Sequence, residues 1–231
     1  MMVSAALEVV DLGTPPTLLP ALAREVDQLW QRRCSEDPGL HDGDIFSVAS
    51  ATPERVTGWF VPYRRFVAQR TDASIVADLG VAPLAVTGRT VTSDRFLIVA
   101  RRGQRVTQDP GTWELAPAGG VDRSARRPNG RVDLGVALRG ELGDELGLVD
   151  DDVVVVTPVA LVIDPGERVH DVVLDVRLRI DAATVVGRFA ERRTDEYDEV
   201  RLVPVVELPG ALAAEARAAG FDEIAALPFH A

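Results

Sequence analysis

The segment from Ala137 to Leu148 constrains the fold more than any other part of the chain. It contains three carboxylates, Glu141, Asp144 and Glu145, at positions i, i+3 and i+4. On a helix this spacing places all three on one face, with Cβ atoms roughly 5–6 Å apart. Like charges held so close repel one another, and a divalent cation such as Mg²⁺ or Mn²⁺ removes that repulsion because it binds hard oxygen ligands. The segment therefore predicts an acidic helix that binds a metal ion.

A strand that breaks into a glycine loop precedes this helix, at Trp-Glu-Leu-Ala-Pro-Ala-Gly-Gly, residues 113–120. Gly119 and Gly120 would let the backbone approach a phosphate or a metal without an intervening Cβ. An ordinary tight turn is the alternative interpretation. Because protein-bound Mg²⁺ usually also binds substrate phosphates, the strand, loop and helix together predict metal-assisted chemistry on a phosphate compound.

This combination resembles the Nudix hydrolase family, whose pattern is a glycine, five residues, a glutamate, seven residues and Arg-Glu-apolar-x-Glu-Glu-x-Gly-apolar. The matching residues are Glu141, Leu142, Glu145, Gly147 and Leu148, with Asp144 in place of a glutamate. The resemblance covers about residues 81–209. It implies an α/β fold, namely an α/β/α sandwich with a mixed sheet, and a Mg²⁺ or Mn²⁺ cofactor. It also implies a small-molecule diphosphate substrate, and homodimers are frequent in families of this kind.

The sequence departs from the family pattern at three places. Gly140 occupies the arginine position, with Arg139 one residue early, and Val132 occupies the upstream glutamate position, beside Asp133. Residues 123–131 form an insertion. In the family the arginine helps to orient the carboxylates and the glutamate supports the metal shell, and such losses weaken a metal site by about 10- to 100-fold.

The resemblance implies roles for particular residues. Glu141 and Glu145 are the preferred metal ligands and act in catalysis, and Asp144 is the third ligand. A general base must reach the attacking water directly. The acidic stretch before a late strand supplies Glu196 as the first candidate and Glu199 as the second, with a polar surface loop as the alternative interpretation.

Arginines and aromatic residues are candidates for substrate binding. Arg101 and Arg102 end a strand, and one of them could bind a phosphate in bidentate fashion; an ordinary charge at a strand end is the alternative. The arginines of the 123–131 insertion would form either a mobile lid or a plain surface loop. Three aromatic residues would either stack on a substrate ring or pack in the core: Trp59, Tyr63 and Trp113.

Glycines are unusually frequent in and around the acidic helix. Each glycine inside a helix costs roughly 1 kcal/mol relative to alanine, so Gly135, Gly140 and Gly143 predict a close approach of this backbone to a loop or sheet. Gly147 is different, because a glycine in the left-handed conformation commonly ends a helix.

Hydrophobic periodicity predicts strands, one acidic helix, further strands and a terminal helix. The expected helices span 17–36 and 211–219, a helical or irregular connection spans 63–78, and the expected strands span 45–49, 56–61, 84–87, 96–100, 153–163, 169–180 and 200–206. A mixed sheet packed between helices satisfies this order. We expect a hydrolase domain at 81–231, preceded by an N-terminal α+β extension at 1–80 that is either a subdomain or pads the same sheet.

Composition limits the class of partner. The net charge of −11 argues against a nucleic-acid surface, but a bound metal can supply local positive charge for a phosphorylated substrate. The single cysteine, Cys34, rules out an internal disulfide. No apolar run is long enough for a membrane span, and the N-terminus lacks the basic region of a signal peptide. We therefore expect a cytoplasmic protein with no membrane partner.

The leading functional hypothesis is a metal-dependent pyrophosphohydrolase that cleaves a nucleoside diphosphate linked to another moiety, of the nucleotide-sugar or ADP-ribose type. One alternative is a hydrolase of a non-nucleotide diphosphate such as an isoprenoid, which a cavity without a base-stacking ring would favour. The other is a Nudix-fold module that binds a nucleotide but does not hydrolyse it, which the departures at Gly140 and Val132 suggest.

Overall fold

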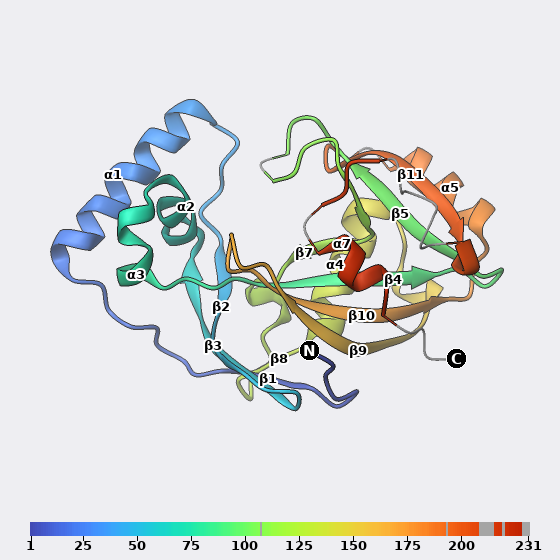
Figure 1. Ribbon diagram of the computed structural model, residues 1–231, viewed down its shortest axis with the longest axis horizontal. Helices are drawn as coiled ribbons and strands as arrows, with labels where there is room; N and C mark the ends of the chain where they lie inside the picture. The colour runs from blue at the N-terminus through green and yellow to red at the C-terminus, as the bar shows by residue number, and fades with distance from the viewer. Residues whose placement is uncertain (107, 193, 208–214, 219, 228–231) are drawn as a thin grey trace.

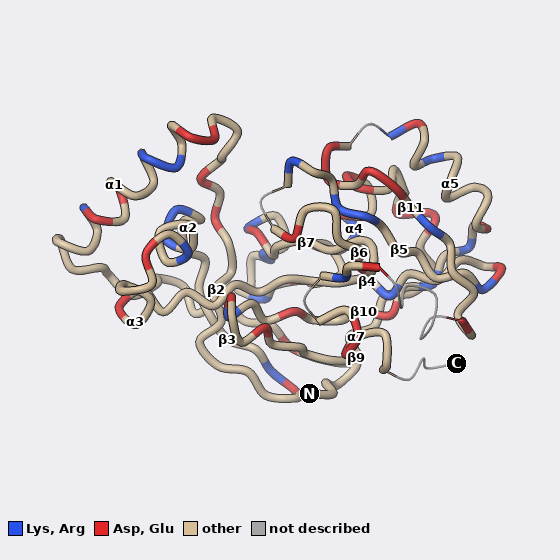
Figure 2. Tube along the Cα trace, turned by 45° about the horizontal axis from the view of Figure 1, so that its top comes forward, with Lys and Arg blue, Asp and Glu red and all other residues tan. Residues whose placement is uncertain are grey.

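The computed structural model describes residues 1–106, 108–192, 194–207, 215–218 and 220–227. The chain forms two lobes (Figure 1): a smaller one with three helices and a larger one built on a sheet. Acidic and basic positions are interspersed along both lobes (Figure 2), so the negative net charge is not gathered on one element. None of the described helices is long and apolar enough to cross a membrane.

A seven-stranded mixed sheet is the centre of the larger lobe. Its main order is β11-β5-β4-β10-β9, with β6 paired to β5 and β7 paired to β4, and only β4 and β10 are parallel to each other. The strands are β4 (Leu84–Val91), β5 (Phe96–Arg102), β6 (Trp113–Leu115), β7 (Ala118–Gly120), β9 (Val153–Ile163), β10 (His170–Leu178) and β11 (Tyr197–Pro204). The strands predicted in this region are confirmed.

Helices cover both faces of this sheet: α4 (Leu134–Leu146) and α5 (Ala182–Glu191) lie on one, and α7 (Phe221–Ala225) lies on the other. The alternation of side chains along β5 shows the layering. Ile98 belongs to the same buried cluster as Leu138 of α4, whereas its neighbour Leu97 belongs to the cluster of Phe221 on α7. Successive strand residues face opposite sides, so the sheet is the middle layer of an α/β/α sandwich, as predicted.

A second, four-stranded sheet joins the N-terminal region to the larger lobe. Its order is β2-β3-β1-β8, with β1 (Glu8–Asp11), β2 (Asp44–Ala51), β3 (Arg55–Pro62) and β8 (Arg131–Val132). Phe46 of β2 and Phe60 of β3 share one buried cluster with Leu84 of β4 and Leu138 of α4. The N-terminal strands therefore extend the core of the larger lobe instead of forming a core of their own.

The smaller lobe consists of α1 (Pro20–Glu36), α2 (Tyr63–Thr71) and α3 (Val76–Leu79). Their buried residues Val26, Leu29, Ala68 and Ile75 form a separate small cluster. The predicted helix at 17–36 and the helical connection at 63–78 are thus confirmed. The expected boundary near residue 80 divides the chain after this lobe, but it does not divide the main core.

The insertion is held against the N-terminal sheet. Arg126 pairs with Asp11 at 2.6 Å, Arg131 pairs with Glu8 at 2.6 Å, and β8 pairs with β1. Arg123 pairs with an aspartate of β2 and lies over an aromatic ring of β3. None of these arginines lines the main cavity. The contacts contradict the lid interpretation and favour a fixed surface loop.

Several elements were not anticipated, among them α5, β1, β8 and α7. α5 begins at Asp181, whose side chain accepts a hydrogen bond from the backbone N–H of Thr184 at 2.9 Å. β1 has only four residues, and its partners β3 and β8 lie far along the chain. The predicted terminal helix at 211–219 falls mostly outside the described residues.

Candidate active site

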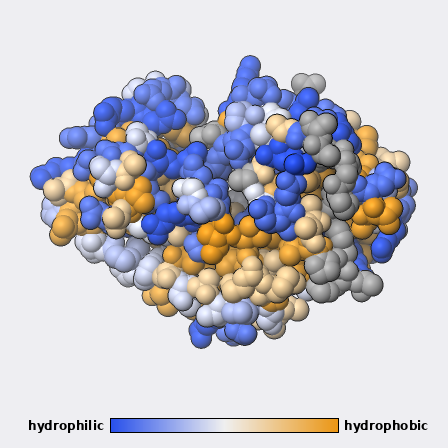
Figure 3. All heavy atoms as spheres, viewed as in Figure 1, coloured by the Kyte–Doolittle hydropathy of each residue, from blue (hydrophilic) through white to orange (hydrophobic). Residues whose placement is uncertain are grey.

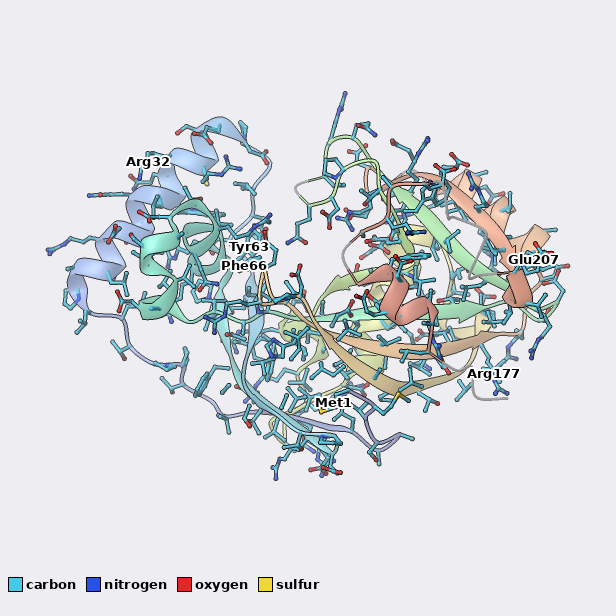
Figure 4. All side chains as sticks on the ribbon, in the orientation of Figure 1. Met1, Arg32, Tyr63, Phe66, Arg177 and Glu207 are labelled. Carbon is cyan, nitrogen blue, oxygen red and sulfur yellow. The ribbon has the colours of Figure 1, made fainter. Side chains whose placement is uncertain are left out.

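A cavity of about 620 Å³ lies between the two lobes. The surface is hollowed there, at the top of Figure 3. Tyr63 and Phe66 of α2 line one side and point toward the larger lobe (Figure 4). The other side is lined by acidic side chains: Glu114, Glu141, Glu145, Asp171 and Glu196. The cavity therefore joins an aromatic wall to an acidic one.

Glu141 and Glu145 lie one turn apart on α4 and both reach the cavity. Glu145 is buried, and it accepts a hydrogen bond from the backbone N–H of Ala118 at 3.2 Å. A Cβ at Gly119 would lie 2.1 Å from Glu141 Oε1. Strand β7 thus passes so close to these carboxylates that position 119 requires glycine. A Cβ at Gly120 would meet no atom within 4 Å, so this glycine borders open space.

Both helix carboxylates are costly to ionise in this position. Burial raises the pKa of Glu141 to about 7, and the charges of Asp144 and Glu196 add to the effect. Burial raises the pKa of Glu145 well above its usual range, and the charge of Glu141 adds to it. A divalent cation bound here would stabilise both charges.

The donor set fits a magnesium-like ion through two carboxylates. Within the described part of the chain, no group of three or more His, Cys, Asp or Glu side chains is arranged to hold a metal. Mg²⁺ commonly uses only one or two carboxylates and completes its shell with water and substrate phosphates. Glu141 and Glu145 meet that requirement, and their oxygens are the hard ligands that Mg²⁺ and Mn²⁺ bind.

Asp144 does not join them. Its side chain is 80% exposed and pairs with Arg192 at 3.2 Å, and Arg192 Nε also donates to the Asp144 carbonyl at 2.7 Å. A residue turns roughly 100° around the helix axis relative to its neighbour. Glu145 is thus about 100° from Asp144, which leaves Asp144 on the side that faces the end of α5. The structure thus does not bring Asp144 together with Glu141 and Glu145, and its role as a third metal ligand stays a prediction.

Arg102 is the centre of a buried ionic network. Its guanidinium pairs with Glu114 at 2.7 Å and with Glu196 at 2.8 Å, and the Tyr197 hydroxyl donates to Glu114 at 2.9 Å. Burial raises the pKa of Glu114 to about 7 despite Arg102 beside it. Arg102 lines the cavity as predicted, but two carboxylates occupy its fork instead of leaving it open to a phosphate. Glu196 also lines the cavity, at the position expected of a base.

Sequence reasoning gave no role to Glu114 or Tyr197. The available signal for Glu114 was an acidic residue between two buried ones, Trp113 and Leu115, in a very short strand. Tyr197 follows Glu196 directly, but 83 residues separate it from its partner Glu114.

Arg101 and Glu199 lie outside the cavity. They pair with each other at 3.3 Å, and each is 41% exposed. Consecutive residues of a strand face opposite sides, so Arg101 points away where Arg102 points in. The structure thus places Arg101 and Glu199 away from the cavity, and their predicted roles in substrate binding and as the second choice of base stay untested.

The three aromatic candidates for substrate stacking lie in different places in the structure. Trp113 is buried in the core, with the guanidinium of Arg201 4.2 Å from its ring centroid. Trp59 does not line the cavity and instead lies at a groove between α1 and α3. Of these three, Tyr63 lines the cavity and is in a position to stack on a substrate ring.

The helix glycines mostly lack the predicted close approach. A Cβ at Gly140 would meet no atom within 4 Å, and one at Gly143 would make only ordinary contact with a carbonyl at 3.5 Å. At Gly135 the neighbours within 4 Å are side chains of Asp133 and Arg139. The steric explanation is therefore wrong for these positions. Gly147 has φ +69° and ends α4, as predicted.

The departures from the family pattern also have structural counterparts. Val132 is buried in the main core and pairs with Val9 of β1, where a charged glutamate would be unfavourable. Arg139, one residue before the usual arginine position, pairs with Asp150 at 3.6 Å instead of with a carboxylate of the cavity.

No protein-family model matches the sequence, and no curated protein matches it. Among solved structures, the DR0079 protein from Deinococcus radiodurans is similar with a TM-score of 0.52 and 16% identity, over 79% of this chain and 96% of that chain. This similarity shows a shared fold over most of both chains.

Two further solved structures match this chain less closely. The MutT protein from Methanosarcina mazei Go1 has a TM-score of 0.42 and 17% identity, over 62% of this chain and 89% of that chain. The NUDIX hydrolase from Alicyclobacillus acidocaldarius has a TM-score of 0.44 and 11% identity, with the same two coverages.

Proposed function

We propose that this chain is a Nudix-type hydrolase that cleaves a diphosphate bond with the help of Mg²⁺ or Mn²⁺. Its substrate is a nucleoside diphosphate linked to another moiety, of the nucleotide-sugar or ADP-ribose type. One observation carries the proposal: Glu141 beside Gly119 and Glu145 beside Ala118 are both desolvated, and both line a cavity large enough for a small molecule. Tyr63 on the opposite wall supports a ring-bearing substrate over an isoprenoid.

Diphosphates resist hydrolysis because their negative oxygens repel a nucleophile. When bound, a divalent ion supplies positive charge to those oxygens and makes a bound water more acidic. Glu141 and Glu145 would hold it. The rest of the catalysis is mostly positioning and electrostatic stabilisation.

Within this scheme Glu196 accepts the proton of the attacking water. Arg102 pairs with the Glu196 carboxylate at 2.8 Å and so limits its orientation. Glu114 binds the other side of the same guanidinium, and Tyr197 donates to Glu114. Arg102, Glu114 and Tyr197 are thus positioning residues, which hold the base where water can reach it.

The binding-only module remains a second candidate because one observation favours it. Of the three carboxylates of the motif, Asp144 pairs with Arg192 at the surface, and Val132 occupies the upstream glutamate position inside the core. Such a module would bind the same class of compound in the same cavity without turnover.

A substrate panel separates the two candidates. Purified protein is incubated with ADP-ribose, nucleotide sugars and farnesyl diphosphate in Mg²⁺ or Mn²⁺, and phosphate is measured after alkaline phosphatase treatment. Turnover that disappears in Glu145→Gln, which keeps the side-chain shape, supports the hydrolase. Nucleotide binding without turnover in either metal supports the module, and neither binding nor turnover contradicts both.

A further inference from the structure

We propose that Asp171 is a specificity residue that binds a hydrogen-bond donor on the non-phosphate moiety of the substrate. The proposal rests on the proposed function and names the part of the substrate that the cavity selects. Asp171 lines the same cavity as the carboxylates of α4, and it lies on strand β10, which pairs with β4.

Asp171 has one satisfied oxygen and one free oxygen. Its Oδ2 accepts a hydrogen bond from the Thr87 hydroxyl at 2.6 Å. Its Oδ1 is buried and has no hydrogen-bond partner among the described residues. An unpaired buried carboxylate oxygen is costly, and in native proteins it calls for a specific explanation. A ligand that brings a hydroxyl or amino group to Oδ1 supplies one.

A trough of small residues leads from Asp171 across the sheet to Gly120 of β7. Asp171 is paired with Ala85 of β4, and Ala85 is paired with Gly120 of β7. These three residues form a row across the sheet about 10 Å long, because neighbouring strands are about 4.8 Å apart. Next to Asp171, Ala85 contributes only a methyl group to this row, and Gly120 contributes only a hydrogen. A Cβ at Gly120 would meet nothing within 4 Å. The small residues therefore leave the floor open on the face of the sheet that α7 covers, and the preceding residue of β7, Gly119, faces Glu141 on the other side.

The far end of the trough also has an aromatic rim. Val169 precedes Asp171 by two residues, directly before β10, and lines the same cavity. Val169 packs against the buried cluster of Phe66, with Tyr63 at its edge. Arg70 of α2 pairs with Glu167 at 2.8 Å and ties the smaller lobe to the loop before β10. Rings above an acceptor suit a sugar or a base, which can both pack and donate.

Charge sets the direction in which a substrate binds. The Asp171 carboxylate repels phosphate, whereas a divalent ion on Glu141 and Glu145 attracts it. The diphosphate therefore lies at the Gly119 end, and the donor-bearing moiety lies at the Asp171 end. An isoprenoid chain has no donor for Oδ1 and leaves it unpaired, so it is disfavoured.

The test replaces one carboxylate oxygen of Asp171 with an amide nitrogen. Asp171→Asn keeps the shape and the bond to Thr87 but can place an amide N–H where Oδ1 was. We expect KM for ADP-ribose and ADP-glucose to rise by about 10- to 100-fold, because a hydrogen bond to a charged group is lost, with kcat nearly unchanged. Ala85→Val, which narrows the trough without touching the carboxylate, should raise KM for the same compounds.

The experiments distinguish a failure of the Asp171 inference from a failure of the proposed function. If the wild-type protein turns over sugar diphosphates and Asp171→Asn has the same KM, the inference is overturned. Preference of the wild-type protein for farnesyl diphosphate overturns it as well. If no compound is hydrolysed, the hydrolase proposal fails, and the inference about Asp171 is tested by calorimetric binding of ADP-ribose. Weaker binding by Asp171→Asn than by the wild-type protein supports the inference. Equal binding by the two proteins, or no detectable binding by the wild-type protein, overturns it.

Discussion

Gly119 and Glu141 are in such close contact that a Cβ on the glycine would lie 2.1 Å from Oε1 of the glutamate and 2.3 Å from its Cδ. The two residues come from different elements, β7 and α4, which meet at the cavity. The contact positions one of the two proposed metal ligands, because the glutamate can adopt this place only beside a residue without a side chain.

Gly119→Ala is therefore expected to displace the Glu141 carboxylate. Because a misplacement of about 1 Å at a reacting site can cost about 100-fold in rate, we expect kcat/KM to fall by at least that factor. The melting temperature should change little, since the displaced atoms belong to a flexible side chain. Steady-state kinetics and thermal unfolding of the same preparation measure both effects.

Gly140→Ala is the matched control. Position 140 lies on the same helix, and a Cβ there meets no atom within 4 Å. The substitution should stabilise the protein by up to about 1 kcal/mol through helix propensity and leave the rate unchanged. A rate loss at 140 as large as at 119 would show that the helix as a whole, and not the contact with Glu141, is sensitive.

Asp144 provides a test of the geometry of α4. Its carboxylate is 80% exposed and pairs with Arg192. Asp144→Asn should alter the free energy of unfolding by less than about 0.5 kcal/mol, as expected for a surface ion pair, and should retain activity. A loss of activity comparable to that of Glu145→Gln would support Asp144 as a metal ligand.

Features of the acidic helix that depend on neighbouring residues could be predicted from the sequence, whereas features that depend on residues far along the chain could not. Its start and end are local: the Asp133 side chain accepts from the Val136 N–H at 3.2 Å, and Gly147 closes the last turn. The direction of Asp144 is not local, because Arg192 lies 48 residues away on a helix end that no motif marked. The sequence alone therefore predicted that Glu141 and Glu145 share one face of the helix, but it could not predict that Asp144 pairs with Arg192.

Arg102→Met tests the buried ionic network. The substitution leaves Glu114 buried without its cation, and removal of one partner of a buried pair typically costs about 3–5 kcal/mol. Chemical denaturation should show destabilisation at the lower end of this range. Adding Glu114→Gln should recover much of the stability but not the activity, since Glu196 still lacks its positioning partner. Equal stability of the single and double variants would contradict this account.

The same network shows why the residues that line the cavity were hard to predict from the sequence. Glu114, Arg102 and Tyr197 come from three different strands, β6, β5 and β11, which are adjacent only after the sheet forms. Strand alternation could have separated Arg101 from Arg102, but it could not indicate which of the two faces the cavity.

Because the Asp171 carboxylate is buried, we expect the difference in stability between Asp171→Asn and the wild-type protein to depend on pH. Burial raises the pKa of Asp171 from 3.8 to about 6, so the folded protein binds this proton more tightly than the unfolded chain does. Its contribution to the free energy of unfolding therefore falls as pH rises from about 4 to about 6. Asparagine has no such penalty. Asp171→Asn should stabilise the protein more at neutral pH than at about pH 4, by up to about 3 kcal/mol.

Urea denaturation of both proteins at the two pH values measures this difference. The comparison with the wild-type protein removes the contributions of other titrating groups, which the two proteins share. Parallel pH profiles would contradict a desolvated carboxylate at position 171.

The central claim is that Glu141 and Glu145 together bind one divalent ion in the cavity, and direct titration with Mn²⁺ tests it most directly. The wild-type protein and Asp144→Asn should bind one ion with similar affinity, and the double variant Glu141→Gln/Glu145→Gln should bind at least about tenfold more weakly. Unchanged Mn²⁺ affinity in the double variant, or no binding by the wild-type protein, would contradict the account.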